Sequence, residues 1–143
     1  MLESLTLMHG CEQDVDKPNK HGLLQCKTLS PSQAIRWMDT IAEIKEKEIK
    51  PLLREVVRIV RKHVPDGSHH ILLFGSWATL QSLPTSDIDV GILGPGPLDD
   101  LVMARIREQI DRLPTLRKIE VVDLWSVGDR FREKAERYAE RLA

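Results

Sequence analysis

The sequence predicts a small α/β domain in which helices pack on a β-sheet. The chain has 143 residues, which is the usual size of a single domain. Hydrophobic residues make up 41% and charged residues 30% of the chain, a balance typical of a globular protein rather than a disordered one. Segments with helical periodicity alternate with short apolar or alternating segments, and this order indicates a sheet covered by helices.

A polar leader precedes the predicted domain. Residues 1–29 show no lasting apolar periodicity, so we expect them to be disordered and residues 30–143 to form the domain. Both cysteines, Cys11 and Cys26, lie in this leader, which favours a reducing, cytoplasmic compartment. The pattern predicts no signal peptide and no membrane span. A net charge of −1 gives no general basic field for a nucleic-acid partner.

The first predicted helix begins at Ser30. Ser30 can cap the helix, Pro31 suits its first position, and Gln33 completes a capping box. Apolar residues then recur at helical spacing as far as Pro51, which we expect to interrupt or restart the helix. A second apolar stripe follows at helical spacing and ends at the turn 65–67. Its members are Leu52, Leu53, Val56, Val57 and Val60.

Strands and helices alternate after this turn. The first strand is a short apolar run, the second alternates between polar and apolar residues, and the third again carries core-like positions. The predicted strands cover residues 70–74, 87–93 and 118–124, and the predicted helices cover residues 77–82, 98–113 and 129–142. This succession of elements supports the α/β class.

Two acidic residues of the second strand indicate the chemistry. Alternate residues of a strand point to one face, about 6–7 Å apart, so Asp87 and Asp89 project together while their apolar neighbours face the core. Two carboxylates at this spacing can hold a pair of divalent ions, which contact the attacking and leaving oxygens in phosphoryl chemistry. Hard oxygen ligands favour Mg²⁺. The pattern therefore predicts a magnesium site on this strand.

A Gly-Ser turn precedes the acidic pair. Gly75 and Ser76 lie where the first strand turns into a helix. Glycine lets the backbone approach a phosphate closely, and the serine hydroxyl and helix-start amides can donate to triphosphate oxygens. An Asp-x-Asp pair alone is a weak signal because surface strands often carry alternating acids. The turn and the pair in this order, after an apolar strand, are much more specific.

These two elements carry a resemblance to a known family. The segments from Gly75 to Ala78 and from Ser86 to Val90 closely resemble the signature of the DNA polymerase beta-like nucleotidyltransferase superfamily. The particular likeness is to the minimal nucleotidyltransferases of bacteria and archaea. The resemblance runs from about Pro51 to Phe131, just over half the chain.

The resemblance implies a fold, an activity and several site residues. The fold is the polymerase beta-like nucleotidyltransferase fold, a small mixed β-sheet with helices packed on it. The activity is the transfer of a nucleoside monophosphate, AMP from ATP, to an acceptor with the help of two Mg²⁺ ions. Asp87 and Asp89 are then the catalytic, metal-binding acids, and Gly75, Ser76 and Ser86 bind the nucleotide.

The resemblance also implies a third carboxylate on a neighbouring strand, for which the chain offers Glu120 and Asp123. Ile119 and Val121 share a face that looks directed to the core, so Glu120 points the other way, as the acidic pair does. Asp123 has the parity of the core residues. We therefore favour Glu120 as the third catalytic and metal-binding acid, with Asp123 in reserve. In relatives this acid positions or deprotonates the acceptor hydroxyl.

A helical partner is implied as well. Members of the family often work with a separately encoded protein of the HEPN type, and in some toxin–antitoxin pairs the transferase modifies this partner with AMP. The helix over residues 31–50 carries more apolar residues than one stripe needs, and Trp and Met are enriched in interface cores. We expect part of it to contact the partner or a second copy of the chain. The alternative is that it packs on the sheet.

Two departures from the family pattern leave other functions open. Many relatives carry a basic residue and a glycine near Thr79 and Leu80, and the third acid is usually Asp rather than Glu. A degenerate transferase that acts as an antitoxin or binding subunit is the alternative to an active enzyme. A phosphatase with Asp87 as nucleophile is disfavoured, because residues 84–86 rather than an apolar strand precede the acids.

Overall fold

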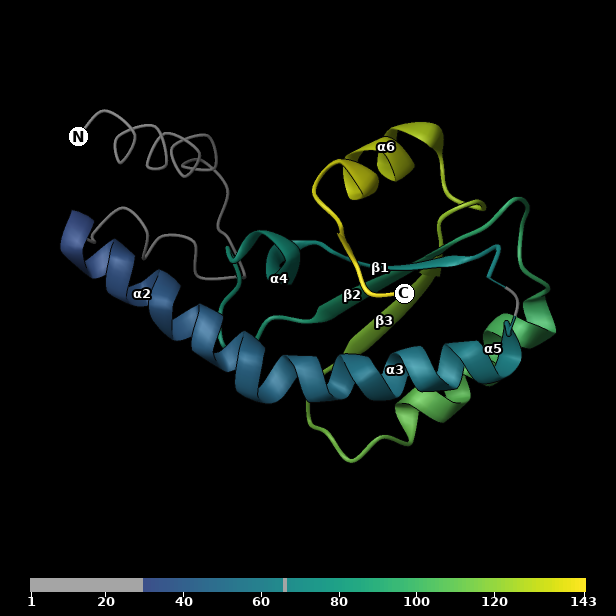
Figure 1. Ribbon diagram of the computed structural model, residues 1–143, viewed down its shortest axis with the longest axis horizontal. Coiled ribbons are helices and arrows are strands. Elements are labelled where there is room, and N and C mark those ends of the chain that lie inside the picture. The colour runs from purple at the N-terminus through teal and green to yellow at the C-terminus, as the bar shows by residue number, and fades with distance from the viewer. Residues whose placement is uncertain (1–29, 66) are drawn as a thin grey trace.

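The computed structural model describes residues 30–65 and 67–143, so the predicted leader lies outside the described residues. At the centre is a four-stranded sheet in the order β3-β2-β1-β4 (Figure 1). β2 pairs antiparallel with β1 and parallel with β3, and β4 pairs antiparallel with the other edge of β1. The strands are β1 (His70–Phe74), β2 (Ile88–Leu93), β3 (Ile119–Asp123) and β4 (Glu140–Arg141). The predicted mixed sheet is confirmed.

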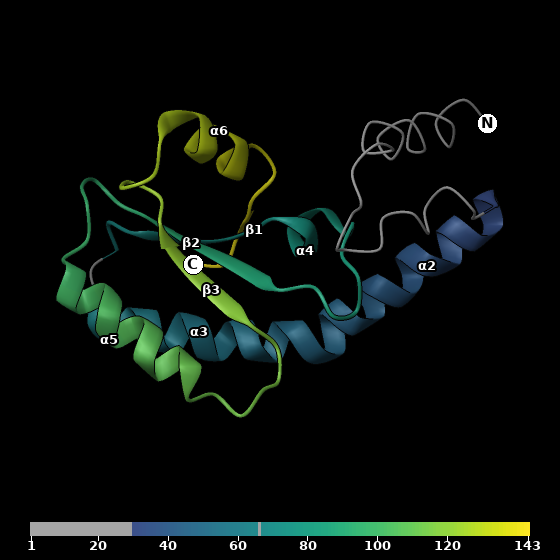
Figure 2. The ribbon, with the colours of Figure 1, turned by 180° about the vertical axis from the view of Figure 1, so that it is seen from behind.

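Helices cover the two faces of the sheet unequally. In order they are α2 (Pro31–Ile44), η2 (Lys45–Ile49), α3 (Lys50–His63), α4 (Ser76–Thr79), α5 (Asp100–Asp111) and α6 (Asp129–Arg137). α2, η2 and α3 follow one another without a break and form one long helix. Its α3 part lies with α5 on one face of the sheet, and α6 lies on the other, as Figures 1 and 2 show from opposite sides. None of the described helices combines the length and the apolar character needed to cross a membrane.

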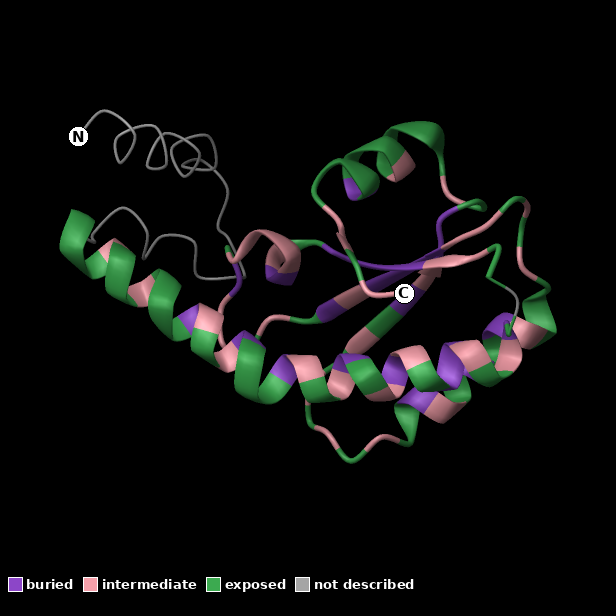
Figure 3. Cartoon of the chain, viewed as in Figure 1, coloured by how far each residue is buried: buried purple, intermediate pink, exposed green. Residues whose placement is uncertain are grey.

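The main core lies between the sheet and the long helix. Ile88, Val90 and Ile92 of β2 are completely buried there, together with residues of α3 and α5. A smaller apolar cluster on the opposite face joins β1 to α6 through Leu72 and Ala135. Figure 3 shows the resulting division, with burial concentrated in the sheet and on the inner side of α3 and most of α6 exposed. One face of β2 is therefore deeply buried, whereas the other is only partly covered.

The start of the long helix agrees with its sequence signals. Ser30 caps α2, because its hydroxyl accepts from the Gln33 amide at 3.4 Å while the Gln33 side chain accepts from the Ser30 amide at 2.9 Å. Pro51 restarts the helix, as expected: α2 ends at Ile44, and α3 begins at Lys50 with the proline in its first turn. Between them η2 widens the backbone into π spacing, with the Lys50 amide donating to the Lys45 carbonyl. This wider turn accommodates a residue that lacks an N–H and clashes in a regular helix.

Three predicted helices are longer than those observed. The helix predicted over residues 98–113 is α5, which spans only Asp100–Asp111. α6 ends at Arg137, and the following residues form β4, whose Arg141 lies opposite Leu72 of β1. The charged, helix-like pattern of residues 129–142 gives no signal for this pairing, because β4 forms by adding to the edge of β1, which lies much earlier in the chain. α4 is a single turn, Ser76–Thr79, and the residue that follows it is Leu80, whose φ of 57° is left-handed. A left-handed residue cannot continue an α-helix.

Candidate active site

Asp89 and Glu120 lie side by side on the open face of the sheet. Asp89 of β2 is opposite Phe74 of β1 and opposite Glu120 of β3. Residues directly opposite each other in a sheet point to the same face. Asp87 immediately precedes β2, has the same parity as Asp89 and is exposed like Glu120, whereas Asp89 is half-buried. Three of the acids named from the sequence are thus gathered on one surface.

The negative charges of this group affect one another. Burial, and then the charges of Glu120 and Asp87, raise the pKa of Asp89 from 3.8 to about 6. Lys118 opposes this shift. Its Nζ lies 3.9 Å from Asp87 Oδ2 and 3.7 Å from Glu120 Oε2. The carboxylates therefore form a repulsive cluster that one exposed lysine partly neutralises.

The three carboxylates have the donor atoms that a divalent cation needs. Carboxylate oxygens are the ligands that Mg²⁺ prefers, and a cation would relieve the repulsion that, after burial, contributes to the raised pKa of Asp89. Within the described ranges, no three His, Cys, Asp or Glu side chains already converge into a complete metal site. Lys118 stands between two of the acids, so closing such a site requires this lysine to move away.

Gly75 brings the Gly-Ser turn against Asp89. It has a φ of 75° and a ψ of −155°, a conformation that is essentially restricted to glycine. A Cβ built on Gly75 would collide with the carboxylate of Asp89, so both the backbone and the space require glycine. Ser76 follows as the first residue of α4. The two elements singled out in the sequence, 75–76 and 87–89, are therefore in direct contact.

Ser86 is built into the loop that leads to Asp87. Its hydroxyl accepts a hydrogen bond from the Leu83 amide at 2.8 Å, and its carbonyl accepts one from Trp77 Nε1 at 3.1 Å. Trp77 is completely buried, as expected for a packing residue. In this structure Ser86 therefore shapes the loop, whereas Ser76 lies at the turn beside Asp89.

Asp123 is separated from the other acids. It lies opposite the buried Ile92 and is itself buried, which places it on the core side of the sheet. Its carboxylate accepts from the Leu98 amide at 3.0 Å, the Trp125 amide at 3.0 Å and the Ser126 hydroxyl at 2.6 Å. Asp123 thus ties together the two loops that follow β2 and β3. This environment places Asp123 away from the open face, on which Glu120 is the third acid.

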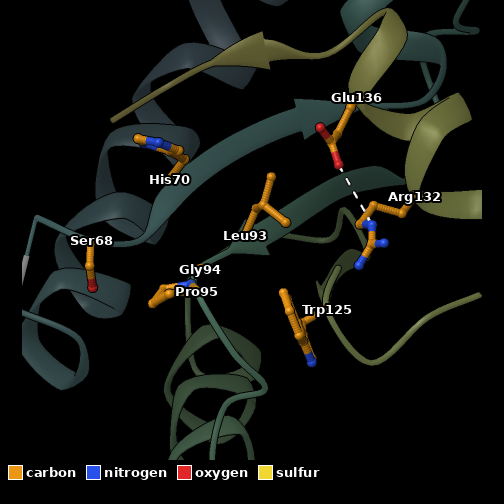
Figure 4. Close-up of a pocket in the computed structure, with 8 residues that line it drawn as sticks. All are labelled: Ser68, His70, Leu93, Gly94, Pro95, Trp125, Arg132 and Glu136. Atoms are coloured by element: carbon orange, nitrogen blue, oxygen red, sulfur yellow. Dashed lines mark ion pairs between the residues drawn. The ribbon is translucent and has the colours of Figure 1, made fainter. Parts of the chain in front are cut away.

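An open cavity of about 470 Å³ lies near His70 and Leu93, at the end of β1 and β2 that is away from the acids (Figure 4). Its lining residues are Ser68, His70, Leu93, Gly94, Pro95, Trp125, Arg132 and Glu136. Arg132 lies over the Trp125 ring at 5.6 Å and pairs with Asp129 at 2.7 Å and with Glu136 at 3.9 Å. The cavity contains none of the clustered acids, which stand on an open surface instead.

Lys118 was not recognised in the sequence as part of the site. It precedes Glu120 by two residues, so strand parity places both side chains on the same face. This parity was the available signal. Its neighbour Arg117, by contrast, donates to Pro84 and Glu48, which are far away in the sequence, so no local pattern singles it out.

The family model described as "Polymerase beta, Nucleotidyltransferase" matches residues 55–142, which include every strand and the whole acidic group. No curated protein matches the chain. A solved toxin–antitoxin structure with AMP-PNP is similar, with 21% identity and a TM-score of 0.51, over 63% of this chain and 71% of the other. The complex of a tri-AMPylated Shewanella oneidensis HEPN toxin with an MNT antitoxin has 19% identity and a TM-score of 0.49, over 66% and 71%. At such identities the first of these similarities establishes the fold.

Proposed function

The chain belongs to the polymerase beta nucleotidyltransferase family, and on this premise we propose that it uses Mg²⁺ to transfer AMP from ATP to a protein hydroxyl. The observation that carries the proposal is the contact between the Gly75–Ser76 turn and an open cluster of three carboxylates, Asp87, Asp89 and Glu120. A phosphate-binding turn beside metal-binding acids is the arrangement that phosphoryl chemistry needs.

Each residue has a defined task in this reaction. Asp87 and Asp89 would hold the metal ions, which supply neutralising charge to the phosphate oxygens when bound. Gly75 lets the triphosphate approach the backbone, and Ser76 donates to its oxygens. Glu120 orients the acceptor hydroxyl and takes its proton. The acceptor oxygen then forms a bond to the α-phosphorus, the bond from this phosphorus to the β-phosphate bridge breaks, and pyrophosphate leaves.

ATP as the donor and a helical toxin as the acceptor are the finer parts of the proposal. The similar solved structure is a toxin–antitoxin complex with AMP-PNP, an ATP analogue. The family resemblance points to a HEPN-type partner. In this chain, α2 extends away from the sheet (Figure 1), and its Ile35 and Met38 are 61% and 42% exposed. We propose that this part of α2 contacts the partner, since exposed apolar side chains on a protruding helix suit an interface.

Mass spectrometry of the two proteins together tests the function. The chain is purified with the product of its neighbouring gene and incubated with Mg²⁺ and each NTP in turn, and the intact mass of both chains is measured. We expect the partner to gain one or more AMP groups from ATP. The Asp87→Asn variant should form the same complex without any gain in mass. A complex that forms normally but gains no nucleotide from any NTP would instead support the non-catalytic antitoxin.

Hydrogen exchange tests the partner surface separately. The backbone amides of residues 31–44 should exchange more slowly when the partner is added. The amides of α5, which lies outside the proposed partner surface, should exchange as before. The double variant Ile35→Ser, Met38→Ser should weaken the complex without changing the fold, because both side chains are exposed. Unchanged exchange of α2 in a stable complex would contradict this surface.

A further inference from the structure

The position of Asp87 depends on a loop that has little structure of its own. Residues 80–87 connect α4 to β2 without a regular helix or strand. Inside the loop, the Ser86 amide donates to the Leu83 carbonyl at 3.0 Å, and the Leu83 amide donates to the Ser86 hydroxyl at 2.8 Å. These bonds close a turn, but they do not attach that turn to the rest of the domain. Something outside the loop must fix Asp87 beside the other acids.

Arg117 provides that attachment. Its guanidinium group donates to the carbonyl oxygen of Pro84 and, at 2.6 Å, to Oε2 of Glu48 in η2. It also lies 5.5 Å from the centre of the Trp77 ring, whose Nε1 holds the Ser86 carbonyl at 3.1 Å. The Arg117 side chain is only 17% exposed. The loop carbonyls of Pro84 and Ser86 are thus held by Arg117 and by the buried Trp77, whose side chains also contact each other.

The same stretch of chain also sets the register between the acids. The carbonyl of Lys118 accepts from the Ile88 amide at 2.9 Å, at the start of the parallel pairing of β2 with β3. The Lys118 side chain contacts Asp87 and Glu120 on the open face. Arg117, its neighbour, instead contacts the buried Trp77. This dipeptide therefore holds Asp87 from two sides, through the loop backbone and through the carboxylate itself.

We propose that Arg117 is a positioning residue of the transferase, which sets the place of Asp87 relative to Asp89 and Glu120. Glu48 accepts a hydrogen bond from the guanidinium, and the Trp77 ring packs against the face of the guanidinium. The role requires arginine, because only its planar fork can donate to a carbonyl and a carboxylate while stacking on an aromatic ring. The expected effect on metal binding rests on the proposed function, whereas the effect on the loop does not.

Hydrogen exchange of the metal-free protein tests the attachment. In Arg117→Met, we expect the Leu83 and Ser86 amides to exchange about tenfold faster, the factor that corresponds to losing a charged hydrogen bond, with α5 unchanged. Arg117→Lys should restore part of the protection. Arg112→Met serves as the matched control, because Arg112 pairs with Glu108 at 2.5 Å on an exposed face and does not contact the loop. Wild-type exchange at Leu83 and Ser86 in Arg117→Met would overturn the proposal.

Mn²⁺ affinity, measured by titration with electron paramagnetic resonance, tests the consequence for the acids. It should fall about tenfold in Arg117→Met, less in Arg117→Lys, and not at all in Arg112→Met. If Arg117→Met fails to fold, Glu48→Gln removes the anchor alone and should change both readouts in the same direction by a smaller factor. A faster-exchanging loop with unchanged Mn²⁺ affinity would overturn the positioning role. A wild-type protein that binds Mn²⁺ but transfers no nucleotide would refute the proposed function and leave the role of Arg117 standing.

Discussion

The two faces of β2 differ in burial, charge and cover. On one face Ile88, Val90 and Ile92 are completely buried under helices, and on the other Asp89 lies half-exposed between Phe74 and Glu120. Because side chains alternate along a strand, one short segment serves both the core and the candidate active site. Stability and chemistry should therefore respond to different residues of the same strand, and substitutions on each face can test this separation.

The largest effect is expected on the open face. Asp87→Asn or Asp89→Asn should reduce nucleotide transfer by at least about 10³-fold, because each removes a charged ligand from the metal-binding group. Circular dichroism and thermal unfolding should show an intact fold. The measurement is initial-rate transfer to the identified acceptor with saturating Mg²⁺. Turnover at the wild-type rate in either variant would contradict the two-metal assignment.

The buried face should give the opposite result. Ile92→Ala should lower the free energy of unfolding by about 2–5 kcal/mol, since it leaves a cavity at a completely buried position. Transfer per folded molecule should stay close to wild type at low temperature. Urea unfolding and active-site titration measure the two quantities. A loss of transfer without a loss of stability would show that the faces are not separable.

The two acids of β3 repeat the comparison within one strand. Glu120→Gln should lower the transfer rate strongly with little change in melting temperature, because Glu120 is exposed beside Asp89. Asp123→Asn should cost about 1–3 kcal/mol of stability, since it turns a donor toward one of the three groups that now donate to the carboxylate. The assignment is wrong if Asp123→Asn abolishes transfer in a folded protein and Glu120→Gln does not.

The raised pKa of Asp89 predicts a pH dependence of the metal-free protein. Between about pH 4 and pH 6 the folded state keeps a proton that the unfolded state releases, so the free energy of unfolding falls as pH rises. Because the carboxyl is half-exposed, solvent screening limits the effect to about 1 kcal/mol. Asp89→Asn should remove this slope and be more stable than wild type at pH 7. Mn²⁺ affinity should fall below about pH 6, because protons compete for Asp89; a pH-independent affinity would contradict the assignment.

The smallest effect is expected at Leu80. Its left-handed φ of 57° costs a non-glycine residue about 1–2 kcal/mol, but its partly buried side chain packs against the core. Leu80→Gly removes both contributions, so the net change in stability should stay within about 1 kcal/mol. Thermal unfolding measures it. A loss of several kcal/mol would show that the packing of Leu80 outweighs its strain.

Local signals in the sequence predicted much of the fold and the side of the sheet on which each acid lies. The capping box at Ser30 concerns residues that are close in the chain, and so does the parity of Asp89 and of Glu120, each within its own strand, so the sequence pattern carries them. β4 and the attachment of Pro84 to Arg117 could not be found in this way, because both depend on partners far away in sequence. The π-helical turn at Pro51 has a local cause, but proline is compatible with either a break or a wider turn.

The π-helical turn η2 gives the long helix a place where the chain can lose one residue without turning α2. A π turn holds one residue more than an α turn, so deletion of one residue from Lys45–Ile49 can be absorbed by closing η2 into a regular α turn. Ile35 and Met38 would then keep facing the same side of the molecule, whereas the same deletion inside α3 would rotate everything before it by about 100° about the helix axis. A one-residue change in length is therefore tolerated at η2 without altering the surface that α2 presents.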